Sequence, residues 1–225
     1  MTAPSPQPGV ELAINALSRR FGARWVLIEI SAEVKAGEAV MLVGANGSGK
    51  TTFLRCLATA LKPHSGEVLF DGQHLWQQRY ALRRQIAFVS HQTRLYEDLS
   101  ALDNLRFWAK LVNFDGDLLQ VLERVGLSRA RKDALRTYSA GMKRRLAMSL
   151  LLLKRPRLVL LDEPFGALDP AGRELIGSML VDLKLQGTTV LVATHLPQQA
   201  AQYCDRQLRL EAGRLVESSL CGVAI

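Results

Sequence analysis

Residues 39–52 read Ala39-Val40-Met41-Leu42-Val43-Gly44-Ala45-Asn46-Gly47-Ser48-Gly49-Lys50-Thr51-Thr52, an apolar run followed by a glycine-rich segment that ends in lysine and threonine. The helical pattern of residues 53–58 follows directly. A strand, a loop and a helix in this order form the context in which the pattern G-x-x-x-x-G-K-[ST] is informative. A glycine-rich turn that matches by chance is the alternative, and the flanking strand and helix argue against it.

The residue types in this loop suit a polyphosphate ligand. Gly44, Gly47 and Gly49 leave room for backbone N–H groups to turn inward around phosphate oxygens. A helix that begins near Gly49 adds the positive end of its dipole. Lys50 can reach the β- and γ-phosphates, and the Thr51 hydroxyl can bind Mg²⁺. The loop therefore predicts a polyphosphate site with an associated magnesium ion.

Length and composition are those of an ordinary globular protein. The chain has 225 residues, 48% hydrophobic and 22% charged, enough for one large domain or two small ones. The longest apolar stretch, residues 146–153, is too short to span a bilayer, so we expect no transmembrane segment. Residues 1–9 lack the features of a signal peptide and predict a flexible, proline-rich tail before a domain at 10–225.

Cysteine spacing predicts the redox state of the thiols, and net charge bears on the possible partners. Cys56, Cys204 and Cys221 are widely spaced and form no C-x-x-C pair, which predicts reduced thiols in a cytoplasmic protein. The net charge of +8 permits binding to nucleic acid or to an anionic membrane surface. A solvated basic face is the alternative, and charge alone does not choose between them.

Apolar patterns predict strands that alternate with helices, which indicates an α/β fold with a mainly parallel, doubly wound sheet. We expect strands at 10–17, 25–31, 39–43, 66–72, 86–90, 157–161 and 188–194, and a small pair near 206–217. We expect helices at 53–58, 75–85, 100–113, 117–125 and 171–185, and one that ends near 153. The helical region interrupts the alternation and predicts a subdomain at roughly 93–155.

Polar residues follow three of the predicted strands at their carboxyl ends. The glycine-rich loop follows Val43, the pair Asp162-Glu163 follows Leu161, and His195 follows the strand that ends at 194. Parallel sheets bind ligands at this edge. We therefore expect these side chains to share one site.

The order of motifs along the chain resembles that of the ATP-binding cassette (ABC) family over nearly the whole sequence. The motifs are the glycine-rich loop, Gln92, Ser139-Ala140-Gly141 before a helix, Asp162-Glu163, Leu168-Asp169, and His195. This resemblance implies a P-loop NTPase fold of the ABC type, with an N-terminal antiparallel β part and a helical subdomain. It also implies an ATPase that uses ATP and Mg²⁺ and forms a homodimer, in which two chains meet head to tail around two ATP molecules.

The resemblance assigns nucleotide-binding roles to both chains of such a dimer. In one chain, the loop from Gly44 to Thr52 would bind the phosphates. From the other chain, Ser139, Gly141 and Asp169 would complete the site in trans.

Phe21 lies between the first two predicted strands and has two interpretations. Its spacing alone favours a core residue at a strand end. The resemblance instead implies that the Phe21 ring stacks on adenine.

The resemblance also assigns the residues of hydrolysis. Glu163 would be the general base that polarises the attacking water. His195 would contact the γ-phosphate together with Lys50, and Gln92 would approach both the metal ion and the water. The metal ion would be held by Thr51, Gln92 and, through water, Asp162.

The signature segment Tyr138-Ser139-Ala140-Gly141-Met142 departs from the family's usual Leu-Ser-Gly-Gly-Gln. Ser139 and Gly141 keep the hydroxyl, the amide and the backbone freedom that a γ-phosphate contact needs. Met142 replaces a polar side chain and cannot supply its hydrogen bond. The basic run 143–145 follows, and we interpret it as structural rather than nucleic-acid binding.

Within the family, the signature, His91-Gln92 and the segments 102–108 and 162–169 resemble the ATPases of cytochrome c maturation, also called haem export. This finer resemblance implies a peripheral protein on the cytoplasmic face of the inner membrane. Closure of its homodimer would drive an integral membrane permease subunit that is CcmB-like, together with a CcmC-like subunit, and no nucleic acid partner is expected.

Three alternatives stay open. The first is the ATPase of another exporter, for drugs, lipid or polysaccharide. The second is a nucleic-acid-associated ATPase, although too few residues separate Lys50 from Ser139 for the long coiled coil of chromosome-type ATPases. The third is a non-hydrolysing scaffold, which the presence of Glu163 and His195 argues against.

The start of the helical region predicts a docking surface for the membrane subunit at 93–112, because this segment directly follows Gln92. The alternative is that its apolar residues pack inside the subdomain. The residues concerned are Leu95, Tyr96, Leu99, Leu105 and Trp108.

Overall fold

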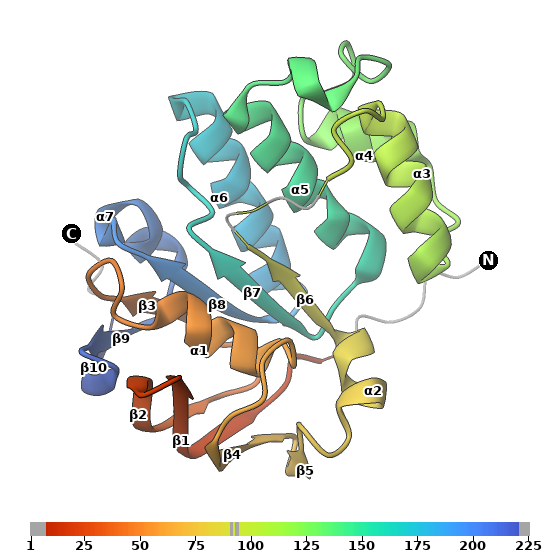
Figure 1. Ribbon diagram of the computed structural model, residues 1–225. Helices are drawn as coiled ribbons and strands as arrows, with labels where there is room; N and C mark the ends of the chain where they lie inside the picture. The colour runs from red at the N-terminus through yellow and green to blue at the C-terminus, as the bar shows by residue number, and fades with distance from the viewer. Residues whose placement is uncertain (1–7, 91, 93–94, 221–225) are drawn as a thin grey trace. The chain divides into compact units, whose positions relative to one another are not determined.

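The computed structural model describes residues 8–90, 92 and 95–220 (Figure 1). The chain forms two compact units. The first comprises the residues up to Phe88, with 156–163 and those from Met179 onward, and the second comprises 89–155 and 164–178. Most of the tail predicted at 1–9 lies outside the described residues, but Gly9 is buried and its carbonyl accepts a hydrogen bond from Arg157.

The first unit contains an antiparallel sheet with the strand order β2-β1-β4-β5. Its strands are β1 (Leu12–Phe21), β2 (Arg24–Val34), β4 (Ser65–Phe70) and β5 (Gln73–His74). Both β1 and β2 are longer than their apolar alternation predicts. Register shifts between β1 and β2 allow the pairing to continue where the alternation breaks.

The prediction of a helix at 75–85 is wrong for the first part of this segment. His74 pairs with Leu69 across the β4–β5 turn, and the backbone N–H of Leu75 donates to the Val68 carbonyl at 2.8 Å. The sheet therefore continues into this segment and prevents a helix from starting. Only α2 (Arg79–Leu82) and the 3₁₀ turn η1 (Arg83–Gln85) are helical.

The other sheet has the order β10-β9-β3-β8-β7-β6 and is parallel in the β9–β3, β3–β8 and β8–β7 pairs, as predicted. Every residue of β3, β7 and β8 is buried, which explains their continuous apolar sequences. The strands are β3 (Ala39–Val43), β6 (Ile86–Val89), β7 (Leu158–Asp162), β8 (Thr189–Thr194), β9 (Arg206–Glu211) and β10 (Arg214–Leu220).

Helix α1 (Lys50–Leu57) lies between the two sheets of the first unit and contacts β2 on one side and β7 and β8 on the other (Figure 1). Phe53, Leu54 and Leu57 of this helix are buried in the core that both sheets share. The packing fixes the helix that directly follows the glycine-rich loop. Among the described residues after β8, the helical elements are α7 (Pro197–Ala200) and η3 (Ala201–Tyr203).

The second unit is helical. It contains α3 (Ala101–Val112), α4 (Leu118–Arg124), η2 (Leu135–Thr137), α5 (Ala140–Lys154) and the first part of α6 (Pro170–Leu185). Side-chain oxygens of Ser100, Asp117 and Ser139 cap the starts of α3, α4 and α5 by accepting backbone N–H groups. Within the described residues, no helix is both long and apolar enough to cross a membrane.

Two of the three cysteines fall within the described residues. Cys56 and Cys204 are buried, and neither forms a disulfide within the described residues. Burial raises the pKa of the Cys56 thiol to about 12. The prediction for Cys221 concerns a residue outside the described part of the chain.

Candidate active site

The glycine-rich loop joins β3 to α1 in a conformation that only glycine permits at two points. A Cβ on Gly44 would collide with the carbonyl oxygen of Leu210. Gly49 has a φ of +113°, and a Cβ there would lie 2.8 Å from the Val26 carbonyl oxygen. The backbone can therefore pack tightly against neighbouring strands on its outer side. Along the loop, Ala45, Asn46 and Gly47 are exposed, and Thr51 and Thr52 are half-buried.

Two buried polar side chains of the loop indicate an anionic ligand. Lys50 is 6% exposed, and its Nζ donates to the carbonyl oxygens of Gly44 at 2.7 Å and Ala45 at 3.1 Å. The Ser48 hydroxyl is buried, with no hydrogen-bond partner among the described residues. Leaving such a group unpaired costs about 1–3 kcal/mol, and a phosphate oxygen would satisfy it. The loop therefore fits a phosphate.

The charge of Lys50 is balanced by two carboxylates. Burial lowers the pKa of Lys50 below its ordinary value, and the nearby Glu163 and Asp162 carboxylates oppose this shift. The structure thus places the three charged groups predicted for catalysis and phosphate binding within electrostatic reach of one another.

Thr51 and Asp162 meet across the start of α1 and the end of β7. The Thr51 hydroxyl donates to the Asp162 carboxylate, with oxygen–oxygen distances of 2.9 and 3.1 Å. Asp162 is 1% exposed. These are hard oxygen donors of the kind that Mg²⁺ prefers, usually together with substrate phosphates and water. No group of three or more His, Cys, Asp or Glu side chains among the described residues could hold a metal ion by itself.

Glu163 and His195 form a pair at the ends of β7 and β8. The Nδ1 atom of His195 lies 2.8 Å from Oε1 of Glu163, and the Thr194 hydroxyl donates to Oε2 at 3.2 Å. The backbone of Glu163 is left-handed, with a φ of +53°, and its N–H donates to the Ala193 carbonyl. Thr194 was not identified from the sequence as a site residue, although its position directly before His195 is a signal that could have indicated it. His195 and Thr194 therefore hold the Glu163 carboxylate in place, and this carboxylate can accept a proton.

Phe21 lies at the end of β1 and is 48% exposed. The core interpretation is therefore wrong. The Arg19 guanidinium lies over one side of the ring, 4.9 Å from its centroid. An exposed, cation-supported ring is free to stack on a planar ligand.

The second unit brings together the three residues predicted to act in trans. Ser139 and Asp169 are exposed, and a hollow of about 350 Å³ is lined by both and by Gly141. The Ser139 hydroxyl accepts the Met142 N–H at 3.1 Å, and the Asp169 carboxylate accepts the Gly172 N–H at 2.9 Å. The remaining lining residues are Ala140, Met142, Arg145 and Ala167.

Gln92 belongs to the same unit. It is exposed, and its backbone carbonyl accepts the Ser90 hydroxyl at 2.6 Å. Its role toward water and metal stays a prediction.

Each residue of the basic run 143–145 is bonded within the second unit, as the structural interpretation predicts. Lys143 pairs with Glu97 at 2.7 Å, and the buried Arg144 donates to the Ser90 carbonyl at 2.8 Å. Arg145 donates to the carbonyl of Val125 at 3.1 Å.

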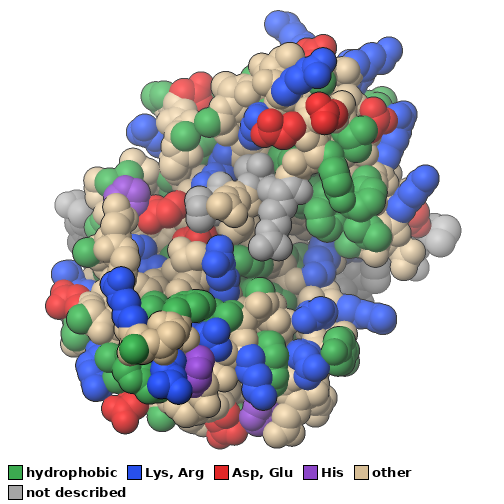
Figure 2. Space-filling view, in the orientation of Figure 1, with side chains coloured by type: hydrophobic (Ala, Val, Ile, Leu, Met, Phe, Trp, Pro, Cys, Tyr) green, Lys and Arg blue, Asp and Glu red, His purple; other side chains and the backbone are tan. Residues whose placement is uncertain are grey.

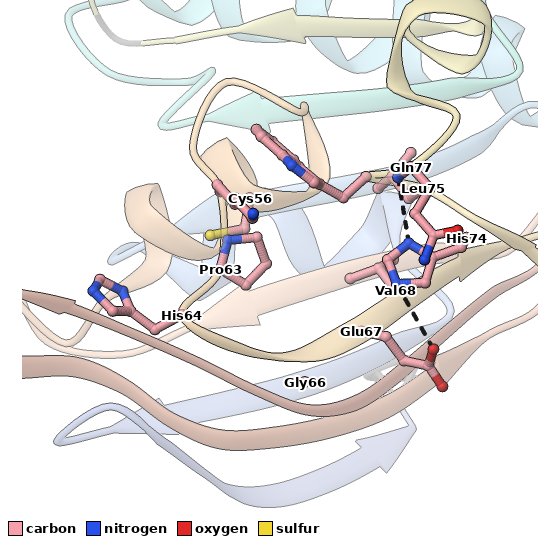
Figure 3. A pocket seen from close by; sticks show the side chains of 11 residues that line it. Cys56, Pro63, His64, Gly66, Glu67, Val68, His74, Leu75 and Gln77 are labelled. Atoms are coloured by element: carbon pink, nitrogen blue, oxygen red, sulfur yellow. Dashed lines mark hydrogen bonds and ion pairs between the residues drawn. The ribbon is translucent and has the colours of Figure 1, made fainter.

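A further hollow, of about 270 Å³, lies in the first unit (Figure 3). Its polar groups face one another: His74 accepts the Gln77 N–H at 3.4 Å and lies 3.9 Å from the Glu67 carboxylate. None of its lining residues is a candidate site residue. They are Cys56, Lys62, Pro63, His64, Gly66, Glu67, Val68, His74, Leu75, Trp76 and Gln77.

Comparison with known proteins identifies the family. The family model described as "ABC transporter" matches residues 27–166. The uncharacterized ABC transporter ATP-binding protein YdbJ of Bacillus subtilis (strain 168) is 38% identical over 216 residues, which cover 94% of this chain and 70% of YdbJ. The cytochrome c biogenesis ATP-binding export protein CcmA of Escherichia coli O157:H7 is 37% identical over 190 residues, which cover 83% of this chain and 90% of CcmA.

A solved structure extends the comparison to the fold. The dimeric post-hydrolysis state of the ATP-binding cassette MJ0796, bound to ADP and Pi, aligns with a TM-score of 0.84 at 26% identity. The alignment covers 94% of this chain and 99% of that one. This chain therefore belongs to the ABC transporter family and has the P-loop ABC ATPase fold. It is an ATP-binding subunit that hydrolyses ATP in support of transport.

Proposed function

We propose that this chain is the ATPase subunit of a cytochrome c biogenesis complex at the cytoplasmic face of the inner membrane. Closure of its homodimer around ATP would move a CcmB-like permease subunit, with a CcmC-like subunit beside it. The observation that carries the ATPase mechanism is the Lys50, Asp162 and Glu163 cluster beside a loop with an unpaired buried hydroxyl. The similarity to CcmA over 90% of its length supports the finer assignment.

Binding of ATP uses groups that the loop already presents. The phosphates lie along Gly44 to Thr52, where Lys50 exchanges its two carbonyl acceptors for phosphate oxygens. The Ser48 hydroxyl gains the partner that it lacks. Thr51 and Asp162 supply oxygens for Mg²⁺, which would neutralise phosphate charge. The exposed ring of Phe21 stacks on adenine.

Hydrolysis needs a base next to the γ-phosphate. Glu163 accepts a proton from water as the water oxygen bonds to the γ-phosphorus. The bond from that phosphorus to the β–γ bridging oxygen breaks, which gives ADP and phosphate. Thr194 and His195 hold the Glu163 carboxylate, and His195 contacts the γ-phosphate when ATP is bound. Gln92 orients the water.

The second unit completes the site of the other chain. Ser139, Gly141 and Asp169 surround one hollow, and no phosphate-binding loop of the same unit lines it. A two-fold dimer uses the same pair of surfaces twice, so each phosphate loop would face the partner's hollow. Hydrolysis would then require both chains.

The permease docks on the exposed apolar surface at the start of the second unit. Hydrophobic side chains gather over α3 in Figure 2. Tyr96 and Phe107 are 48% and 38% exposed, and their rings meet edge to face at 5.0 Å. Leu105 was wrongly assigned to this surface, because it is fully buried. Leu99 and Leu111 are also exposed and extend the surface.

The ATPase of another exporter stays an alternative. YdbJ, whose substrate is not stated by its name, is as similar as CcmA, so sequence identity does not select cytochrome c biogenesis. A nucleic acid partner has no such support, since the basic run 143–145 is bonded within the protein.

Cross-linking and co-purification from native membranes test the proposal. The variant Tyr96→Cys, in a chain whose natural cysteines are replaced by serine, is expected to cross-link to a CcmB-like permease. Leu119→Cys is a matched control, because Leu119 on α4 is equally exposed at 49% and lies outside the docking surface. Recovery of a different permease would support the other-exporter alternative. Cross-links from Leu119 alone would contradict the docking surface.

A further inference from the structure

One turn of the second unit, residues 95–100, is fixed on its inner side by a buried amide. Asn104 is 0% exposed, and its side chain bonds both the N–H and the carbonyl of Tyr96, at 2.9 and 3.0 Å. It also donates to the Ser100 carbonyl at 3.0 Å. The turn is therefore rigid and joined to α3, and it carries two residues of the proposed docking surface, Tyr96 and Leu99.

The same turn is bonded to the chain just before the signature serine. The Arg136 N–H donates to the Glu97 carbonyl at 2.9 Å, and the Leu135 N–H donates to the Leu99 carbonyl at 3.0 Å. These two donors lie three and four residues before Ser139. Two hydrogen bonds thus fix the backbone just before the signature serine to the turn.

On the C-terminal side, a side chain makes the connection. Lys143 lies in the first turn of α5, and its backbone N–H donates to the Ser139 carbonyl at 3.0 Å. Its ammonium lies 2.7 Å from the Glu97 carboxylate. Lys143 is 21% exposed at the side chain and Glu97 is 62% exposed. The turn therefore brackets Ser139, with backbone bonds before it and an ion pair after it.

Charge explains why this ion pair acts on the start of the helix. The first turn of α5 contains no acidic residue, although its partial positive charge favours one. Lys143 adds a further positive charge close by. The Glu97 carboxylate, which comes from outside the helix, offsets both and keeps the first turn of α5 intact.

We propose that Glu97 and Lys143 are positioning residues, whose ion pair holds Ser139 in the geometry that the partner chain's nucleotide requires. This inference rests on the proposed trans role of Ser139. The pair acts through Ser139 and touches no nucleotide itself. It also gives the docking surface a direct mechanical link to the hollow, because Tyr96, Glu97 and Leu99 belong to one fixed turn.

The test measures ATP-dependent dimerisation by sedimentation in a Glu163→Gln background, which keeps ATP unhydrolysed. Lys143→Glu places two carboxylates together and is expected to weaken the dimer about 10-fold, since each of two sites loses roughly 3-fold. The double variant Glu97→Lys/Lys143→Glu restores the opposite charges and is expected to recover most of the loss. Fluorescent-ATP affinity of the monomer is expected to stay unchanged in each variant, which also shows that the chain is folded.

A matched control lies one residue away. Asp98 and Arg136 form a pair at 3.7 Å, with side chains that are 91% and 71% exposed. Arg136→Glu makes the same charge reversal opposite the same turn and is expected to leave dimerisation within 2-fold, because ion pairs this long and this exposed contribute nothing measurable in many cases.

The outcomes separate the two proposals. If the Glu163→Gln parent does not dimerise with ATP, the proposed dimer mechanism fails and this inference fails with it. If the parent dimerises and Lys143→Glu dimerises equally well, only the positioning role is refuted. Loss in Lys143→Glu without recovery in the double variant likewise refutes it, because the role requires the pair and not Lys143 alone.

Discussion

The two half-sites of this ATPase differ in how their polar groups are occupied. In the first unit, Lys50, Thr51 and Glu163 are hydrogen-bonded to groups of their own chain, so contacts within the unit fix the side chains of the phosphate half. In the second unit, the side chains of Ser139 and Asp169 accept backbone N–H groups at the starts of two helices, and both residues line an open hollow. We therefore expect the first half to bind a nucleotide alone, and we propose that the second half acts on a nucleotide that another chain presents.

The largest expected effect comes from removing the base of the phosphate half. Glu163→Gln keeps the shape of the side chain but accepts no proton, so turnover is expected to fall roughly 10²- to 10⁴-fold. ATP binding should persist, and an ATP-trapped dimer should be detectable by sedimentation. Hydrolysis at the parental rate would show that Glu163 is not the base.

The second prediction compares the two halves directly. Lys50→Ala removes a charge-assisted phosphate contact and is expected to weaken ATP binding to the monomer by about 1.5–3 kcal/mol, or roughly 10- to 150-fold. Ser139→Arg is expected to leave monomer affinity unchanged and to block dimer closure. Fluorescent-nucleotide titration at concentrations too low for dimerisation measures both. Equal losses would mean that Ser139 acts on its own chain's nucleotide, against the head-to-tail arrangement.

A smaller effect is expected at the adenine end of the phosphate half. Phe21→Ala removes an exposed ring and is expected to lower ATP affinity by about 0.5–1.5 kcal/mol, roughly 2- to 12-fold. Phe21→Tyr should retain the affinity. Trp25→Ala is the matched control, because Trp25 is 47% exposed on the adjacent strand and has no assigned role. An equal effect of both alanine variants would argue against stacking by Phe21.

The smallest effect concerns the fold of the open half. Ser139→Ala removes the cap of α5 and is expected to lower the free energy of unfolding by about 1 kcal/mol, measured by urea denaturation. Ser139→Asp keeps a capping oxygen and should keep this stability, but its carboxylate would repel the γ-phosphate and prevent dimerisation. If Ser139→Asp dimerises normally, Ser139 does not face a phosphate.

The phosphate half could be predicted almost to the residue because its signals are local. A continuous apolar strand must be buried, glycine permits the loop, and strand ends converge at one sheet edge, so β3, α1 and Asp162 fall where the sequence places them. The unpaired Ser48 hydroxyl could not be foreseen, because it depends on the packing around it.

Predictions failed where contacts between distant residues decide the structure. The segment at 75–85 has helical spacing, yet pairing with β4 draws its start into a sheet. Helical periodicity placed Leu105 on an apolar face without showing that this face points inward. The ion pair of Glu97 and Lys143 joins residues far apart in sequence, and no local pattern marks it.

The left-handed backbone of Glu163 has a consequence for the stability of this protein. A residue with a side chain costs about 1–2 kcal/mol in this conformation, a strain that glycine would not carry. Glycine at position 163 would relieve this strain but would also remove the carboxylate that bonds His195 and Thr194. If Glu163 is the base, as we propose, this position exchanges stability for turnover, and strain of this kind is a feature of functional sites.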